Sequence, residues 1–273
     1  MTGTGSSMDT STSHACDLCG SSDRTELRQA ARFGSGGVFV CNDCGFVYVP
    51  IRRTQEELNA FWTAAYSNGI YSARWPAVQA RLEYVKCWYG EKFGWRGKRV
   101  FEIGAGEGVF LDKIRLLAMS AYGCEPAFIG GALPGWTDQT IPEMDKFDVV
   151  AILWTLENTL DCVGVLKKAR EMLKPDGHLL VATGSRLMVP FKKPIELYFS
   201  QNPPDTHCYR FSGSSLENAL HQGGFSEVRN NPYREQDWLV IVGRPYDGAM
   251  GDVQAEPANS VLRFFDEWEA CQW

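Results

Sequence analysis

The stretch Val100-Phe-Glu-Ile-Gly-Ala-Gly-Glu-Gly108 decides the fold, because it joins an apolar run that predicts a strand over 99–103 to a segment that predicts a helix over 109–117. Glycines at such a turn let the backbone approach a ligand closely at the carboxyl end of a sheet. The nicotinamide fingerprint GxGxxG would need glycine at position 109, where the chain has valine. The observed GxGxG spacing, with Glu102 two residues before the first glycine, therefore predicts a nucleotide-binding turn without identifying the nucleotide.

Strand-like and helix-like segments alternate after that turn, which is typical of a sheet of mainly parallel strands. Further strands are predicted over 121–124, 147–154 and 178–182, and further helices over 161–173 and 214–221. The strands predicted over 225–230 and 238–243 are too close for a helical crossover, so we expect an antiparallel pair. Glu125 directly follows the strand predicted over 121–124, at a position where an acid can hold ribose hydroxyls.

Two matched cysteine pairs stand near the N-terminus, as Cys16-Asp-Leu-Cys19-Gly20 and Cys41-Asn-Asp-Cys44-Gly45. CxxC followed by a second CxxC is the spacing of a tetrathiolate zinc site, and the glycine after each pair permits a left-handed turn. The alternatives are unrelated cysteines or a redox CxxC. The match favours one structural Zn²⁺ held by Cys16, Cys19, Cys41 and Cys44, with no coordination position left open for chemistry.

Charge and hydropathy exclude several classes of protein. Lys and Arg number 27 against 33 Asp and Glu, a net charge of −6, which argues against a dedicated nucleic-acid or anionic-membrane binder. The longest apolar run, 149–156, is far shorter than a membrane span. The opening MTGTGSSMDTSTSH lacks the basic and apolar regions of a secretory signal, and nine cysteines occur without a secretory context. We therefore expect a cytoplasmic protein with no nucleic-acid or membrane partner.

Composition, together with residues that begin or end predicted helices, divides the chain into five parts. A capping box, Thr54-Gln-Glu-Glu57, opens a helical stretch, and Gly94 and Gly97 end it. The predicted parts are a disordered leader at 1–13, a zinc ribbon at 14–50, a helical linker or lid at 51–96, a cofactor-binding domain at 97–245 and a tail with a helix at 246–273.

Over about residues 80–245 the chain resembles the class I S-adenosylmethionine-dependent methyltransferases. The resemblance rests on Phe101-Glu-Ile-Gly-Ala-Gly-Glu-Gly108, Gly123-Cys-Glu125-Pro126, Phe147-Asp-Val-Val-Ala-Ile-Leu-Trp-Thr-Leu-Glu-Asn158, Leu173-Lys-Pro-Asp-Gly177 and the closing strand pair. It implies an α/β, Rossmann-like, seven-stranded sheet whose last strand is antiparallel, and S-adenosylmethionine as the cofactor. The residues that it assigns to the cofactor are Glu102, Gly104, Ala105, Gly106, Gly108, Glu125, Pro126 and Trp154.

The two cysteine pairs and Cys44-Gly-Phe-Val-Tyr look like the zinc-binding domain that precedes some of these methyltransferases, sugar C-methyltransferases among them. The chain departs from the family pattern at Asn158, where histidine is common, and at 126–146, which is short for a helix and a third strand. We expect no counterpart of the further C-terminal domain of the sugar enzymes. The resemblance implies methyl transfer to O or C of a small acceptor, a sugar or a natural-product intermediate.

The candidate base lies in Asp205-Thr-His207-Cys-Tyr209-Arg-Phe211. If this stretch is extended, alternate residues share one face, and a histidine titrates near neutral pH, as a general base must. This interpretation makes His207 the base with help from Tyr209. The alternative is a histidine with a structural role.

Two rival functions remain open at this point. One is an RNA or protein methyltransferase whose ribbon grips the macromolecule, although residues 1–50 carry three arginines against five acids, which is poor for binding phosphate. The other is a catalytically inactive binding protein that kept the fold. The short 126–146 segment and Asn158 support this alternative, because both depart from the family pattern.

Overall fold

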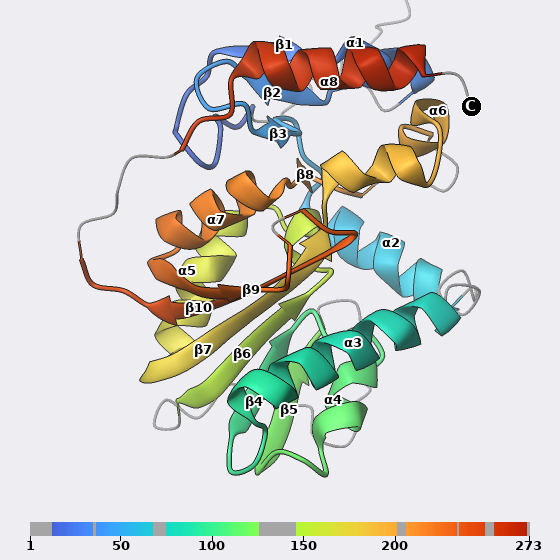
Figure 1. Cartoon of the computed structure of the whole chain (residues 1–273). Coiled ribbons are helices and arrows are strands. Elements are labelled where there is room, and N and C mark those ends of the chain that lie inside the picture. The colour runs from blue at the N-terminus through green and yellow to red at the C-terminus, as the bar shows by residue number, and fades with distance from the viewer. Residues whose placement is uncertain are drawn as a thin grey trace, which may run out of the picture.

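The computed structural model describes residues 13–34, 37–67, 75–125, 146–200, 206–233, 235–248 and 254–271 (Figure 1). The described strands are β1 (Arg24–Glu26), β2 (Phe39–Cys41), β3 (Val47–Tyr48), β4 (Arg99–Ile103), β5 (Ser120–Cys124), β6 (Phe147–Leu153), β7 (Leu173–Gly184), β8 (Tyr209–Arg210), β9 (Phe225–Asn230) and β10 (Trp238–Pro245). They form a six-stranded sheet in the order β5-β4-β6-β7-β10-β9 and a four-stranded sheet in the order β1-β2-β3-β8.

The pairing of the larger sheet confirms the expected α/β architecture. Strand β4 pairs in parallel with β5 and β6, and β6 pairs in parallel with β7. Strand β10 is antiparallel to both β7 and β9, as the short connection between the last two strands predicted. The seventh strand that the resemblance implies would fall in 126–145, which lies outside the described residues.

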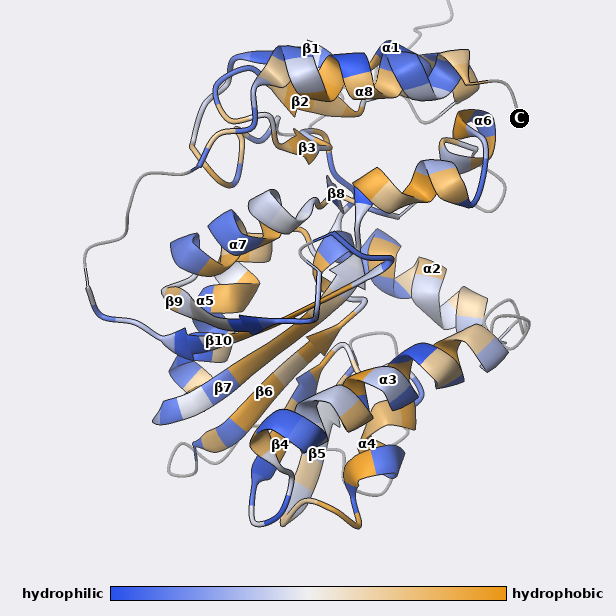
Figure 2. Ribbon diagram, in the orientation of Figure 1, coloured by the Kyte–Doolittle hydropathy of each residue, from blue (hydrophilic) through white to orange (hydrophobic). Residues whose placement is uncertain are grey.

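Helices cover both faces of this sheet, and the alternation of side chains along β6 shows why. The helices are α1 (Arg28–Phe33), α2 (Gln55–Ser67), α3 (Trp75–Phe93), α4 (Val109–Ile114), α5 (Cys162–Met172), α6 (Ile195–Tyr198), α7 (Gly213–Gln222) and α8 (Ala258–Ala270). Val149 and Ala151 pack in one buried cluster with α3 and α4, whereas Val150 and Ile152 pack in another with α5 and α7. Figure 2 shows the apolar sheet between these layers.

Several element ends differ from the sequence expectation. Helix α4 ends at Ile114 rather than at 117. Strand β7 starts at Leu173 and runs through Lys174-Pro-Asp-Gly177, whereas the sequence predicted a strand only over 178–182. The pairing of β6 with β7 shifts register between Phe147 and Val149, so residues 174–177 are accommodated as an irregularity at the start of the strand.

The smaller sheet unites segments from both ends of the chain. Strand β8 pairs with β3, and α8 packs against this sheet, so its Phe265 and Trp268 share a buried cluster with Val40 and Val47 (Figure 1). Arg28 of α1 lies 3.0 Å from Asp266 of α8. Contacts thus cross the predicted boundaries at 50/51 and 245/246, and the five-part division stays a prediction.

Ser13, the last residue of the predicted leader, forms an isolated β-bridge with Ile51, while residues 1–12 lie outside the described part.

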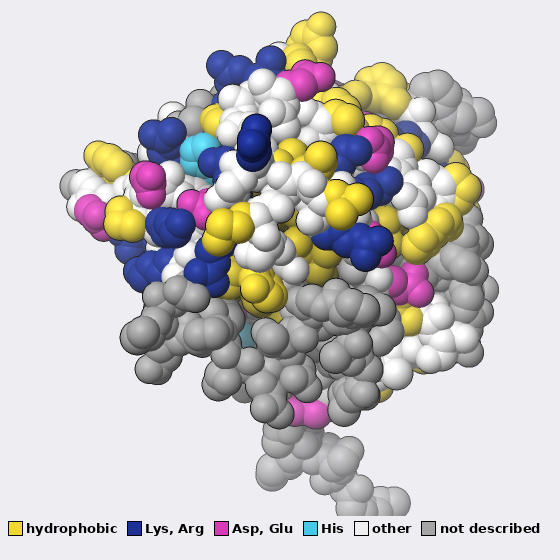
Figure 3. All heavy atoms as spheres, turned by 90° about the horizontal axis from the view of Figure 1, so that it is seen from below, with side chains coloured by type: hydrophobic (Ala, Val, Ile, Leu, Met, Phe, Trp, Pro, Cys, Tyr) yellow, Lys and Arg dark blue, Asp and Glu magenta, His cyan; other side chains and the backbone are white. Residues whose placement is uncertain are grey.

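Figure 3 shows basic, acidic and apolar side chains interspersed on the lower face of the molecule. In the described ranges, every helix is too short or too polar to cross a membrane.

His178 is a buried histidine at the amino end of the parallel core, on β7. Arg244 donates a hydrogen bond to its Nε2 at 3.3 Å, and its Nδ1 lies 2.8 Å from the Tyr89 hydroxyl. Because Arg244 is always a donor, Nε2 must be unprotonated and the imidazole neutral. Burial, with the positive charge of Arg244 as the next cause, lowers the pKa of His178 to about 4.

We expect His178 to destabilise the fold as the pH falls. Above about pH 6.5 the imidazole is neutral in both states, whereas between about 6.5 and about 4 only the unfolded chain takes up the proton. The free energy of unfolding should therefore fall by up to about 3 kcal/mol over that window. Urea titrations of the wild type and of His178→Gln, at pH 7 and at pH 4.5, measure this, and equal losses in both proteins would contradict it.

Candidate functional site

The glycine turn between β4 and α4 adopts a backbone that only glycine takes easily. Gly104, Gly106 and Gly108 have φ angles of 74°, 52° and 76°. A Cβ added to Gly104 would lie 2.2 Å from Cγ2 of Thr155, and one added to Gly106 would lie 2.9 Å from the Tyr66 hydroxyl. The turn is thus held between two neighbouring side chains, with its backbone at the carboxyl end of the sheet.

Two carboxylates lie beside this turn, because parallel pairing sets Glu102 of β4 next to Gly123 of β5, two residues before Glu125. Glu125 accepts a hydrogen bond from the Gly106 N–H at 3.1 Å. Glu102 is 3% exposed, and its Oε2 has no hydrogen-bond partner in the described structure. Burial, followed by the charge of Glu125, raises the pKa of Glu102 well above its usual range. This shift favours the protonated form of Glu102, which can donate a hydrogen bond.

A cavity of about 440 Å³ opens above these residues. One wall is polar and comes from the ends of β4, β5 and β6, with Glu102, Gly104 and Glu125 in it. A second wall is largely apolar and aromatic and comes from α2 and α3. A third follows β6 and runs into α5. The side chains that give the second and third walls their character are Leu58, Trp62, Tyr66, Val78, Leu82, Asn158, Thr159, Leu160, Asp161 and Val165.

Trp154 lines the cavity just after β6 and has a strained backbone. Its φ of 52° is positive, which no other non-glycine residue of the described chain shows. Its N–H donates to the Ala182 carbonyl at 2.7 Å, and the guanidinium of Arg81 lies 4.3 Å from the ring centroid. Strain of this kind persists only where the surroundings hold the residue, and it gathers at binding sites.

Glu157 is a second buried acid, on the 3-10 helix Leu156–Asn158 behind the cavity. It is 7% exposed, and its Oε2 has no hydrogen-bond partner among the described groups. Burial raises the pKa of Glu157, while the charges of His207 and Arg81 and a hydrogen bond with Thr183 oppose that shift. Its neighbour Asn158, which stands where the family often has histidine, accepts a hydrogen bond from Thr206 at 2.6 Å.

The residues that the sequence assigned to the cofactor mostly come together. The cavity is lined by Glu102, Gly104, Ala105, Gly106, Glu125 and Trp154. Gly108 belongs to the same turn but caps α4 instead of lining the cavity. Pro126 lies outside the described residues.

His207 and Tyr209, the predicted base and its helper, lie in different surroundings. His207 is exposed, whereas Tyr209 is 1% exposed and stacks on Phe46 with ring centroids 5.6 Å apart. The Tyr209 hydroxyl donates to Asp17 at 2.8 Å and accepts from the Cys162 N–H at 3.2 Å. Its phenol is therefore occupied in the interior and is unavailable to an acceptor. Neither residue is among the described residues that line the cavity, so the role of His207 as base stays a prediction.

The sequence predicted a helical linker or lid at 51–96 but marked neither Arg81 nor Trp62 as a cavity residue, and both line the cavity. A signal was present, because Arg81 lies within one turn of Val78, Leu82 and Val85, all of which are buried. A cation on the apolar stripe of a helix indicates either a buried ion pair or a ligand.

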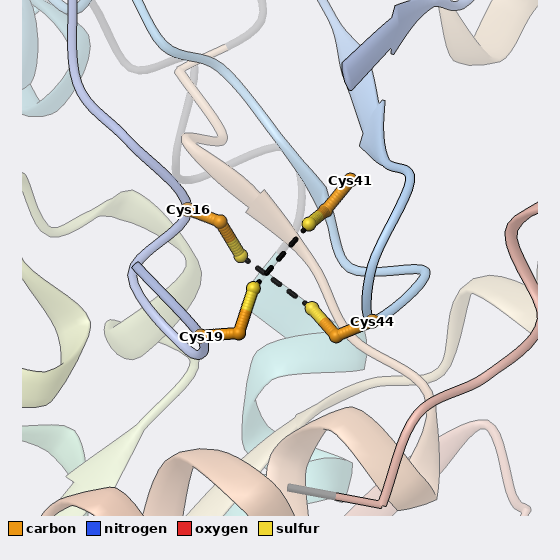
Figure 4. A group of neighbouring side chains, drawn as sticks. All are labelled: Cys16, Cys19, Cys41 and Cys44. Carbon is orange, nitrogen blue, oxygen red and sulfur yellow. Dashed lines mark hydrogen bonds between the residues drawn. The ribbon is translucent and has the colours of Figure 1, made fainter. Parts of the chain in front are cut away.

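The four cysteines converge on one point, as Figure 4 shows. Their Sγ atoms all lie within 4.8 Å of one another, and the pairs Cys16–Cys44 and Cys19–Cys41 are 3.5 and 3.4 Å apart. Four sulfurs at about 2.3 Å from one zinc ion lie roughly 3.8 Å apart in a tetrahedron, so the cluster fits that ion.

Each cysteine pair folds into the same knuckle. The Gly20 N–H donates to the Cys16 carbonyl at 2.8 Å, and the Gly45 N–H donates to the Cys41 carbonyl at 2.9 Å. Both glycines have positive φ, 76° and 71°, as the sequence predicted. The hydrogen bond from Cys44 lowers the pKa of Cys16 to about 6, so one thiol of the cluster ionises readily.

Comparison with known proteins gives a consistent result. The profile of a family described as "Methyltransferase domain" matches residues 82–230, more than half of the chain. Ubiquinone biosynthesis O-methyltransferases of Haemophilus ducreyi and Marinobacter nauticus are 24% and 25% identical to it, over 56% and 61% of this chain and 75% and 79% of their own. The 1,6-didemethyltoxoflavin-N1-methyltransferase of Burkholderia thailandensis, solved with S-adenosylhomocysteine bound, superposes with a TM-score of 0.51 at 16% identity, covering 75% of this chain and 97% of that one.

Proposed function

We propose that this chain, which belongs to the methyltransferase-domain family and is an S-adenosylmethionine-dependent methyltransferase, methylates a small acceptor. In this proposal the methyl group goes to O or C of an acceptor held in the cavity described above. The observation that carries this proposal is the meeting of a glycine turn and two acids with an aromatic wall in one cavity of about 440 Å³. That volume lies within the roughly 300–1,000 Å³ of small-molecule sites. The names of the ubiquinone biosynthesis O-methyltransferases and of the structurally similar 1,6-didemethyltoxoflavin-N1-methyltransferase support a small acceptor.

The polar wall suits the cofactor. In this proposal the backbone of 104–108 approaches the cofactor, Glu125 accepts from its ribose hydroxyls, and Glu102 donates or accepts at the neighbouring edge. Arg81, held over Trp154, suits the cofactor carboxylate, because a guanidinium pairs well with that group. Trp62 and Tyr66 on α2 then face the acceptor.

Bound S-adenosylmethionine supplies an activated methyl group. An acceptor O or C would use an electron pair to bond to that methyl while the sulfur–carbon pair returned to sulfur, which would leave as S-adenosylhomocysteine, and the acceptor proton would pass to a base or to water. The protein aligns the two partners and keeps water out, and alignment alone accounts for much of such a rate enhancement. His207 as the base is a narrower proposal, which turnover of His207→Ala with an identified acceptor tests.

The acceptor class is open to a direct experiment. Purified protein is incubated with methyl-labelled S-adenosylmethionine and matched panels of phenols, sugars, peptides and RNA. We expect label in a phenol or a sugar, with sugars favoured if the chain shares the chemistry of the sugar C-methyltransferases. Label only in peptide or RNA would overturn the small-acceptor proposal, and cofactor binding without transfer to any panel would favour the inactive binding protein.

The glycine turn gives a sharper prediction for the cofactor. Gly106→Ala places a Cβ against Tyr66 inside the cavity, so affinity for S-adenosylhomocysteine should fall by tenfold or more, which corresponds to about 1.4 kcal/mol. Gly97→Ala is the matched control, since Gly97 also has a positive φ, 77°, but an added Cβ meets nothing within 4 Å. Calorimetric titration should find the control unchanged, and equal affinities in the two variants would count against this site.

We also propose that Cys16, Cys19, Cys41 and Cys44 hold one structural Zn²⁺. The ribbon face that carries them is buried against the methyltransferase domain, which argues for a structural role rather than for gripping a macromolecule. Cys41→Ser should lose the metal and lower Tm, because it removes one of four ligands. Cys271→Ser, at an exposed cysteine, should keep about one zinc per chain by elemental analysis. A wild type that is folded and free of zinc would refute this proposal.

A further inference from the structure

The first cysteine knuckle carries an acid that points away from the sulfurs and into the protein. Asp17 lies between Cys16 and Cys19, and its carboxylate accepts two hydrogen bonds from Arg52, at 3.0 Å on Oδ1 and 2.5 Å on Oδ2. The side chains of Arg52 and Asp17 are 2% and 9% exposed. Tyr209 adds a third bond to Oδ1 at 2.8 Å, and its ring lies 4.9 Å from the Arg52 guanidinium.

Arg52 and Tyr209 also form hydrogen bonds with the backbone of the segment that makes the third wall of the cavity. Nη1 of Arg52 also donates to the Leu160 carbonyl, and the Tyr209 hydroxyl accepts from the Cys162 N–H at 3.2 Å. Leu160 lines the cavity, together with its neighbours Thr159 and Asp161. Asp161 is the N-cap of α5 and accepts from the Gly164 N–H at 2.7 Å. One layer of side chains therefore separates the first cysteine knuckle from the cavity wall.

A backbone connection runs beside this bridge. The Val49 N–H, just after β3, donates to the Cys208 carbonyl at 2.8 Å, and the Cys208 N–H donates to the Glu157 carbonyl at 2.8 Å. The segment 157–162, part of which lines the cavity, thus has a buried charged link to the first knuckle and a backbone link to the end of β3. Removing one partner of a buried ion pair is strongly destabilising, because the other partner is left as an uncompensated buried charge.

We infer that Asp17, Arg52 and Tyr209 are positioning residues that couple the cysteine knuckle to the cavity wall at 159–162, so that metal and cavity ligand strengthen each other's binding. The inference rests on the proposed function, since it needs both the zinc ion and the cofactor. Zinc fixes the Cys16–Cys19 loop and hence the direction of the Asp17 carboxylate. Arg52 and Tyr209 then hold the carbonyl of Leu160 and the first N–H of α5 in their binding positions.

Such a coupling must be reciprocal. If the metal raises the affinity for S-adenosylhomocysteine by some factor, then S-adenosylhomocysteine raises the affinity for the metal by the same factor, commonly about 5- to 150-fold. A residue that merely contributes to stability would not link the two affinities. The linkage is therefore the property to measure, and it needs no acceptor.

The test uses the full-length zinc-loaded protein in equilibrium competition with a chromogenic zinc chelator, with and without saturating S-adenosylhomocysteine. In the wild type we expect S-adenosylhomocysteine to raise the zinc affinity at least fivefold, a change within the usual range of such couplings. Asp17→Asn should abolish this effect and weaken S-adenosylhomocysteine binding about tenfold. Asp43→Asn is the matched control, because Asp43 is an exposed acid of the second knuckle, and it should behave as the wild type.

Tyr209→Phe keeps the test decisive if Asp17→Asn fails to fold, because it preserves the stacked ring and removes only the hydroxyl that joins Asp17 to the Cys162 N–H. Its coupling should fall below that of the wild type. Full coupling in Asp17→Asn, or in Tyr209→Phe where only that variant folds, would overturn the inference, as would a wild type that binds both ligands independently. A wild type that binds no zinc or no S-adenosylhomocysteine would instead overturn the proposed function and the coupling with it.

Discussion

Parallel pairing of β4 with β5 and β6 is the constraint on which the site depends. Strands that run in parallel end at the same edge of the sheet, and their connections must cross over through helices. The chain therefore delivers Glu102, Glu125 and Trp154 to one edge from three separate segments. The glycine turn follows, because the chain must leave β4 and enter α4 without a side chain filling the space above the strand ends.

Burial, more than ion pairing, sets the protonation of the important acids and of one base. Glu102 and Glu157 are held toward their neutral forms because water is excluded from them, and the nearest charges only modify that effect. His178 at the opposite end of the sheet is held neutral for the same reason. Neutral acids in a closed site can donate hydrogen bonds, which carboxylates cannot do. The core of the sheet thus defines the chemistry available at its edge.

The cysteine ribbon is part of the same core. Cys16, Cys41 and Cys44 are buried in one cluster with side chains of α5, α7 and the large sheet. On its other face the small sheet buries Val40 and Val47 against α8. A ribbon of two- and three-residue strands has little core of its own, so its order depends on these two faces. The four-cysteine cluster and the large sheet are for this reason parts of one packed core.

The sequence by itself determined whatever depends on local pattern. The run over 147–154 was long and apolar enough to predict a buried strand, the short gap before 238 predicted an antiparallel closing pair, and CxxC spacing predicted a cluster that four thiols can form. Glu102, Gly104, Gly106 and Glu125 could be named because a turn after a strand and the end of the neighbouring strand meet at one edge in any parallel sheet.

Only the tertiary structure decided which distant segments meet. Strand β8 has two residues, too few for an alternating pattern, and its pairing with β3 buries Tyr209 and leaves His207 exposed. Helix α8 looked like a separate tail, yet it completes the N-terminal sheet. The place of Arg81 over Trp154 likewise depends on how α3 crosses the sheet. Contacts between residues far apart in the chain come from the packing of whole faces, and local periodicity shows that a face is apolar without showing what covers it.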